Sequence, residues 1–158
     1  MSGAGDTTVS GGLEMVITNP NRYSDVPRDV LTGWLRRLLA GLAPETESFG
    51  VRFVGDRKMR ELNRVYRGVD RTTDVLSFTG EKTVEGHHLG DVAISVPRAR
   101  SQAAERGHGT AVEIAHLLLH GVLHCLGYDH ERDSGEMELL EKRLRREWIR
   151  TEEWEAPS

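Results

Sequence analysis

The sequence predicts a single α+β domain, in which a small mixed β-sheet packs with helices around a central metal-binding helix. Two observations predict the fold class and a third predicts the metal. The 158 residues suffice for one domain with its own core, and no internal repeat or linker divides them. Short β-branched segments and longer amphipathic segments alternate irregularly, which is typical of α+β proteins. Three histidines within residues 120–130 have the spacing of metal ligands.

We expect residues 13–150 to form this domain, with a tail at either end. Residues 1–12 are rich in glycine and serine and lack the basic start and apolar stretch of a signal peptide, so a flexible tail is expected. Residues 151–158 are expected to form a C-terminal tail. The single cysteine, Cys125, excludes an internal disulfide and suits a reducing compartment. No segment has the length and apolarity of a membrane span, so a soluble cytoplasmic protein is expected.

The start of the domain predicts a strand, a helix and a second strand. Leu13–Ile17 is short, apolar and β-branched enough for the first strand, and residues 49–53 alternate as the second. Asp25 can cap the intervening helix and Pro27 fits its first turn. That helix carries a wide apolar stripe, expected in the core, of Val30, Leu31, Trp34, Leu35, Leu38, Leu39 and Leu42.

A basic helix is expected at Asp56–Tyr66, with Met59, Leu62 and Tyr66 facing inward. The formal net charge of −4 argues against indiscriminate nucleic-acid binding, but the segment Val51–Arg71 contains seven basic and three acidic residues. Such a segment can guide a polyanion to one place, or it can be an ordinary solvated helix face. Charge alone does not decide between the two.

Two strands and the metal-binding helix are expected after the basic segment. The strands are Asp74–Phe78 and Leu89–Val96, joined by a polar loop. The metal-binding helix is expected at Thr110–Leu126. It begins with a capping box, in which the side chains of Thr110 and Glu113 would satisfy the first free amides.

A last helix is expected after the metal-binding helix. Asp133 and Glu136 form a second capping box at its start. Its inner side is apolar and carries Met137, Leu140, Leu144 and Trp148.

His120, His124 and His130 are the expected metal ligands. On one helix, His120 and His124 lie on the same face, four residues apart, where both imidazoles can hold one ion. Gly127 can adopt the left-handed conformation that ends a helix, so the chain can turn back and bring His130 to the same ion. Three nitrogen ligands leave the fourth position of one zinc ion per chain open, as in catalytic sites. His116 is too far from His124 to share this ion and is expected to support the site or the fold.

The spacing of these histidines also matches the zincin-type metallopeptidase signature H-E-x-x-H-x-x-G-x-x-H. Gly121 stands where those peptidases carry the glutamate that acts as general base, so the expected site is zincin-like without that base. A zinc metallopeptidase or other small hydrolase is therefore the alternative function. A non-catalytic ribosome-associated factor is a third hypothesis, and its structural zinc would need a fourth protein ligand, for which Asp129 and Cys125 are the nearest candidates.

Three ordered blocks of the sequence carry a family signature. They are Leu62–Phe78, Leu89–Ser95 and His116–His130, the last with the pattern H-x3-H-G-x-L-H-x-L-G-Y-D-H. Together they resemble the YbeY-type rRNA maturation endoribonucleases, across nearly the whole expected domain. Thr72 and Thr79 depart from the resemblance, because many members of that family have proline at both positions.

The resemblance implies a zinc-dependent endoribonuclease that matures small-subunit rRNA and acts in ribosome quality control. It implies that the three histidines hold the zinc and that Arg67 lies beside the metal and the substrate, which makes Arg67 and His120 the expected catalytic residues. An arginine there could offer planar, bidentate donors to a phosphate. The alternative for Arg67 is an ion pair with Asp70 or Asp74.

The expected substrate is single-stranded, because a shallow site on a small domain reaches unstacked strands more easily than a closed A-form helix. The expected partners are single-stranded rRNA and ribosomal particles, with neither DNA nor a membrane. The sequence points to no particular oligomeric state.

Overall fold

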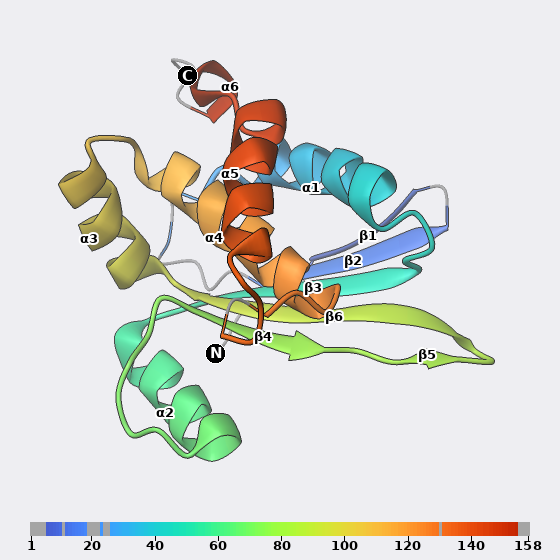
Figure 1. Cartoon of the computed structure of the whole chain (residues 1–158), viewed down its shortest axis with the longest axis horizontal. Coiled ribbons are helices and arrows are strands. Elements are labelled where there is room, and N and C mark those ends of the chain that lie inside the picture. Colours follow the sequence, from blue (N-terminus) through green and yellow to red (C-terminus); the bar gives the residue numbers. More distant parts are fainter. Residues whose placement is uncertain (1–5, 11, 19–22, 24–25, 130, 155–158) are drawn as a thin grey trace.

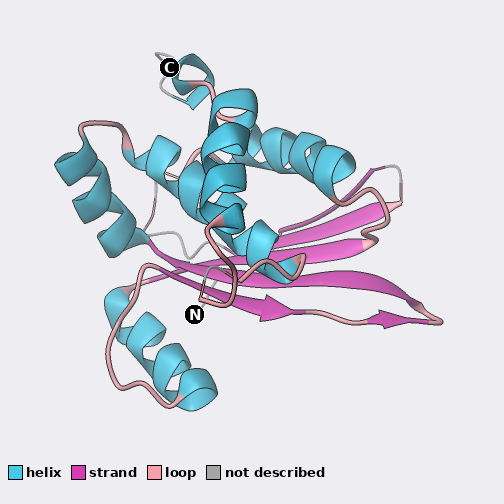
Figure 2. Cartoon of the chain, viewed as in Figure 1, coloured by secondary structure: helices cyan, strands magenta, loops and turns pink. Residues whose placement is uncertain are grey.

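A computed structural model describes residues 6–10, 12–18, 23, 26–129 and 131–154. It shows a mixed β-sheet with helices on both sides (Figure 1, Figure 2), which confirms the predicted α+β class. None of the described helices is long and apolar enough to cross a membrane.

The sheet has the strand order β1–β2–β3–β6–β4. The three central strands are parallel to one another, and the edge strands β1 and β4 run antiparallel to their neighbours. β5 pairs with the start of β6 as a hairpin. The strands are β1 (Asp6–Ser10), β2 (Leu13–Thr18), β3 (Ser48–Val54), β4 (Val75–Thr79), β5 (Lys82–Thr83) and β6 (Gly86–Ser95).

Helices α1, α4 and α5 lie on one side of the sheet, and α2 lies on the other (Figure 1). α4 is central, because it contacts β4 and β6 below it and α3 and α5 beside it. The helices are α1 (Arg28–Leu42), α2 (Asp56–Arg67), α3 (Val96–Arg106), α4 (Thr110–Cys125), α5 (Glu136–Trp148) and α6 (Thr151–Trp154).

The main core lies between the sheet and the helices α1, α4 and α5. The predicted stripe of α1 is confirmed, since Leu31, Trp34 and Leu35 are all buried. α4 is buried on most of its surface because it is covered on several sides, which explains a composition too apolar for a surface helix. Gly121 lets α4 approach β6 closely, because a Cβ atom there would lie 2.8 Å from a methyl carbon of Val92.

Both predicted tails contain regular structure. Asp6–Ser10 forms β1 and pairs with β2, so the expectation of a flexible tail over residues 1–12 is wrong for this segment. Thr151–Trp154 forms α6, and the buried ring of Trp154 packs edge-on against Trp34 with 5.2 Å between ring centroids. β1 pairs with the next strand along the chain and Trp154 contacts a ring distant in sequence, and the composition of a chain end reveals neither contact.

Helix α3 is absent from the sequence prediction, which extended the preceding strand to Val96. The chain instead leaves β6 at Ser95, whose hydroxyl accepts a hydrogen bond from the amide of Arg98 as a helix N-cap. Pro97 occupies the first turn of α3, where proline favours a helix.

Three details of the predicted helices are wrong. Tyr66 was expected to face inward, but it is 65% exposed. The capping box of Thr110 and Glu113 does not form, because Gly109 is the N-cap and the Glu113 carboxylate is buried against other side chains. Pro27 is the N-cap of α1 rather than part of its first turn, and the predicted cap Asp25 lies outside the described residues.

Candidate active site

An open cleft of about 790 Å³ lies between the C-terminal half of α4, strand β4, the end of α2 and the segment that leads into α5. It brings together three residues that the sequence singled out, Arg67, His120 and His124. The other residues that line it are Thr73, Asp74, Val75, Ser77, Thr79, Gly127, Tyr128, Asp129, Glu131, Arg132, Asp133 and Glu136.

The rings of His120 and His124 meet edge to face on the cleft side of α4, with 4.6 Å between their centroids. Their Nε2 atoms lie 3.0 Å apart. Two nitrogens bound to one tetrahedral zinc at about 2.05 Å would lie about 3.3 Å apart, so a shift of a few tenths of an ångström suffices to hold an ion. The pair thus has the geometry of two ligands of one metal.

The third expected ligand, His130, lies outside the described residues. α4 ends as predicted: Gly127 has a φ of +100°, and the amide of Tyr128 donates to the carbonyl of Leu123 over 3.1 Å. The residues on either side of position 130, Asp129 and Glu131, both line the cleft.

Arg67 is the last residue of α2, and Gly68 ends that helix in the left-handed conformation. The alternative role for Arg67, an ion pair with Asp70 or Asp74, is not found among the described residues. Asp70 pairs with Arg60 at 2.8 Å, and an oxygen of Asp74 accepts a hydrogen bond from Gln102 at 3.0 Å. Arg67 therefore lines the cleft without one of these carboxylates to neutralise it.

The two nearby candidates for a fourth ligand, Cys125 and Asp129, each have other partners in the structure. Cys125 faces the sheet, where its Sγ atom lies 3.9 Å from the carbonyl oxygen of Phe78. Burial, with a smaller effect of Asp91, raises the pKa of the Cys125 thiol to about 12, as expected for a thiol packed in the core. Asp129 accepts a hydrogen bond from the amide of Glu131 and lies 3.4 Å from Arg132.

Position 121 offers no room for a peptidase base. A Cβ atom on Gly121 would lie 2.8 and 2.9 Å from the methyl carbons of Val92 and 3.1 Å from the hydroxyl of Ser77. Val92 is 1% exposed, so its methyl groups are packed against neighbouring residues. A glutamate at this position would push α4 off the sheet.

Two residues near the histidines were missed by the sequence reasoning. Glu141 on α5 lies 2.5 Å from Nδ1 of His120, and Arg145 donates to its other carboxylate oxygen over 2.6 Å. Burial alone would raise the pKa of Glu141, but the hydrogen bond from His120 and the charge of Arg145 outweigh it and hold that pKa below its usual value. The sequence contained a signal: Glu141 lies between Met137 and Leu144 on the apolar face of α5.

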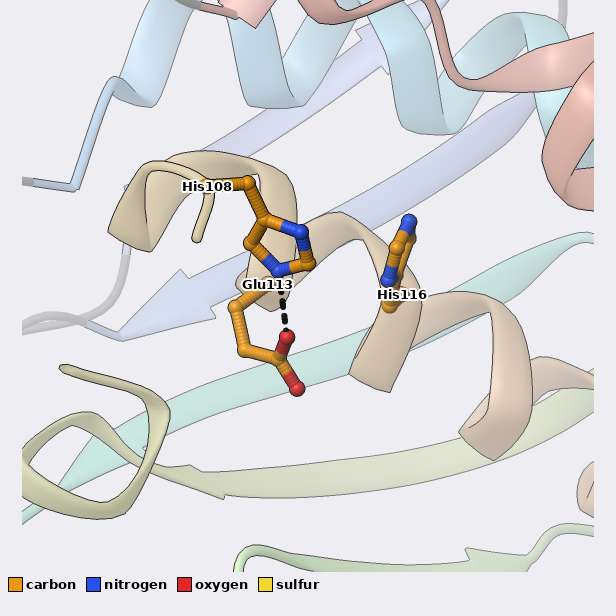
Figure 3. A group of neighbouring side chains, drawn as sticks. All are labelled: His108, Glu113 and His116. Carbon is orange, nitrogen blue, oxygen red and sulfur yellow. Dashed lines mark hydrogen bonds and ion pairs between the residues drawn. The ribbon is translucent and has the colours of Figure 1, made fainter. Parts of the chain in front are cut away.

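A second histidine cluster lies at the start of α4 (Figure 3). One ligating atom from each of His108, Glu113 and His116 lies within 4.8 Å of the others, close enough to hold a metal ion. The Glu113 carboxylate already has two partners, Nε2 of His108 and a guanidinium nitrogen of Arg106, each at 2.6 Å. None of these residues lines the cleft.

His116 belongs to this second cluster and not to the cleft. Its ring lies edge to face with that of His108, and its Nδ1 atom has no hydrogen-bond partner among the described residues. Burial, with a smaller effect of Arg145, lowers the pKa of His116 to about 4, so the ring is neutral at pH 7.

The described residues match one protein family over most of their length. A family model described as endoribonuclease YbeY matches residues 16–148. The endoribonuclease YbeY of Solibacter usitatus is 48% identical over 118 residues, which cover 75% of this chain and 77% of that protein. The endoribonuclease YbeY of a Synechocystis strain is 39% identical over 145 residues, covering 82% and 75% of the two chains.

A solved structure has the same fold. The solution structure of TM1509 from Thermotoga maritima aligns with a TM-score of 0.53 and 27% identity, over 81% of this chain and 83% of that one. The match thus extends over most of both chains.

Proposed function

Since the chain belongs to the endoribonuclease YbeY family and is thereby an endoribonuclease, we propose that it is a zinc-dependent, single-strand-specific enzyme of rRNA processing. Its substrate is small-subunit rRNA, matured at the 3′ end, and it acts in ribosome quality control in the cytoplasm. Ribosomal particles are its partners. The observation that carries the proposal is the pair of facing Nε2 atoms of His120 and His124 in the cleft that Arg67 lines.

In this proposal, one zinc ion is held by His120, His124 and His130. The 3.0 Å separation of the first two Nε2 atoms supports it, as does the left-handed turn at Gly127 that follows them. Zinc with three protein ligands acts as a Lewis acid toward a phosphoryl oxygen and activates water near neutral pH. The cluster of His108, Glu113 and His116 is a poorer candidate for catalysis, because its carboxylate is fully buried and both of its oxygens are held by Arg106 and His108.

Arg67 would bind the scissile phosphate from the opposite wall of the cleft. A guanidinium group donates two parallel hydrogen bonds to a phosphate and stabilises the charge that builds up on its oxygens during cleavage. Because Asp70 is paired with Arg60, the donors of Arg67 are not taken by that carboxylate.

The cleft has more acidic than basic lining residues, so a bound cation would favour the entry of RNA. Five of its lining residues are acidic, Asp74, Asp129, Glu131, Asp133 and Glu136, against Arg67 and Arg132. A bare cleft of this composition would repel a phosphodiester, whereas a divalent cation at the histidines offsets the carboxylates next to the reacting phosphate. Metal binding and substrate binding are therefore coupled in this proposal.

One preparation, assayed side by side on single-stranded RNA, duplex RNA and an unfolded protein, tests the proposal. We expect cleavage of single-stranded RNA, slow cleavage of the duplex and no proteolysis, because an open cleft admits an unstacked strand. Rising salt should weaken cleavage steeply, since phosphate contacts release counterions.

The His120→Ala variant, purified in the same way, is the control for contaminating nuclease. Zinc-dependent proteolysis without RNA cleavage would replace the proposal with the peptidase alternative. RNA cleavage that is equal in the variant and the wild type would show a contaminant, and a binding role on the ribosome would become the better account.

A further inference from the structure

Glu141 on α5 reaches across to the proposed metal site on α4. Its Oε1 atom lies 2.5 Å from Nδ1 of His120, and its Oε2 atom accepts a hydrogen bond from Arg145 at 2.6 Å. The three side chains thus form a chain that runs from the guanidinium through the carboxylate to the imidazole. Glu141 is 13% exposed, so solvent competes little with either contact.

The contact determines which nitrogen of His120 carries the proton. A carboxylate only accepts hydrogen bonds, so Nδ1 of His120 must be the protonated nitrogen, and the lone pair of the neutral ring lies on Nε2. Nε2 is the atom that lies 3.0 Å from Nε2 of His124. The carboxylate therefore holds His120 in the tautomer and orientation that a metal ligand needs.

We propose that Glu141 is a positioning residue of the metal site, with Arg145 fixing its carboxylate. This inference rests on the proposed function, in which His120 is a ligand. A ligating histidine commonly donates its second ring N–H to a carboxylate, which orients the ring and makes the ligating nitrogen more basic, and loss of that partner weakens metal binding about 10- to 100-fold.

The position of Glu141 on α5 is not that of an ordinary charged residue on a solvent-exposed helix face. It lies one turn from Met137 and from Leu144, which are 1% and 3% exposed, so it occupies the buried face of its helix. A carboxylate on an apolar face is retained only when partners compensate for lost hydration, and here His120 and Arg145 do so.

The same helix offers a matched control. Glu138 pairs with Lys142 at 3.2 Å, with the same spacing as Glu141 and Arg145, but both side chains are more than half exposed. Glu138→Gln makes the same chemical change as Glu141→Gln on the same helix, away from the histidines. The loss of an i,i+4 ion pair within α5 would not by itself make the zinc affinity of the two variants differ.

Zinc affinity, measured by competition with a chelator, is the first readout. We expect Glu141→Gln to bind zinc about 10- to 100-fold more weakly than the wild type and Glu138→Gln to bind it equally well. If Glu141→Gln does not fold, Arg145→Gln replaces it and should weaken zinc binding several-fold. Equal affinity of the folded variant and the wild type would overturn the proposal and leave Glu141 as a tie between α4 and α5.

The tautomer of His120 is the second readout and needs no metal. Nitrogen NMR of the metal-free protein should find the proton on Nδ1 in the wild type, and both tautomers in Glu141→Gln, because an amide can donate or accept. Unchanged tautomers would contradict the positioning role. If His120→Ala retains full zinc while the tautomers behave as expected, the proposed metal site fails but the effect of Glu141 on the ring stands.

Discussion

Two clusters of similar composition and different surroundings lie at the two ends of α4, with His108, Glu113 and His116 at its start and His120, His124 and Glu141 at its end. At the start of the helix, the carboxylate of Glu113 lies among the rings and is held directly by Arg106 and His108. At its end, the carboxylate of Glu141 contacts Nδ1 of His120. The other ring nitrogen of His120, Nε2, faces Nε2 of His124.

The two carboxylates have different partners. In the first cluster the carboxylate is fully buried with both oxygens in use, so the charges are already balanced within the protein. In the second, the carboxylate contacts Nδ1 of His120, while Nε2 of that ring faces Nε2 of His124, and both histidines line the open cleft. The position of the carboxylate relative to the rings, more than the count of histidines, is the basis on which we propose the second cluster as the metal site.

Removal of a histidine from each half gives the largest expected contrast. His120→Ala, His124→Ala and His130→Ala should each lose most of one zinc per chain, because two ligands rarely hold the ion. His116→Ala should keep the zinc, since its ring faces His108. Elemental analysis of the purified proteins measures this, and zinc loss in His116→Ala alone would transfer the metal site to the other half of the helix.

Removal of Arg67 should affect the reaction without affecting the metal. Arg67→Ala should lower RNA cleavage about a hundredfold at unchanged zinc content, because a donor to the charged phosphate is lost. Arg67→Lys should restore little, since an ammonium lacks the two-pronged geometry. Arg64→Ala, an exposed position on the same helix, is the control in steady-state assays; an equal loss there would indicate a general charge effect.

Glu113→Gln tests the claim that the first cluster is structural. The change removes the charge that Arg106 and His108 share, and we expect it to lower the free energy of unfolding by about 2 kcal/mol. Zinc affinity should stay the same. Urea unfolding measures the first effect and chelator competition the second, with the exposed Glu105→Gln on α3 as control. Weaker zinc binding at unchanged stability would reverse the assignment.

The pH dependence of stability gives the smallest contrast. Since the pKa of His116 is about 4 in the folded protein and about 6.5 in unfolded chains, the unfolded state binds more protons between these values. Stability should therefore fall as pH drops from 6.5 toward 4, by about 1 kcal/mol after allowance for the partly exposed ring. His116→Phe should remove this part of the pH dependence in unfolding titrations at pH 7 and 5.

The features that could be predicted from the sequence are those set by the spacing of residues along one helix and retained in the tertiary structure. The boundaries of α4, its end at Gly127 and the common face of His120 and His124 follow from helical spacing and from one glycine, so they could be predicted. The stripe of α1 could be predicted for the same reason. These features depend on residues close together in the sequence.

The errors have tertiary causes. Glu113 has the right spacing for a capping box, but buried contacts with Arg106 and His108 take its carboxylate away from the helix end. Tyr66 lies on the side of α2 that packs against Phe78, with 5.1 Å between ring centroids, yet most of its ring remains exposed. The contact of Glu141 with His120 depends on how α5 packs against α4, which cannot be predicted from the periodicity of either helix.

The contact between Gly121 and Val92 restricts how this fold can change its chemistry. Addition of the peptidase glutamate at position 121 takes a single codon change in principle, but the side chain has no volume to occupy until the valine on β6 becomes smaller. With the glutamate alone, its Cβ atom would overlap Val92, so α4 or β6 would have to move. The close packing of α4 on β6 at Gly121 and Val92 thus hinders the single substitution that would add the peptidase base to this motif.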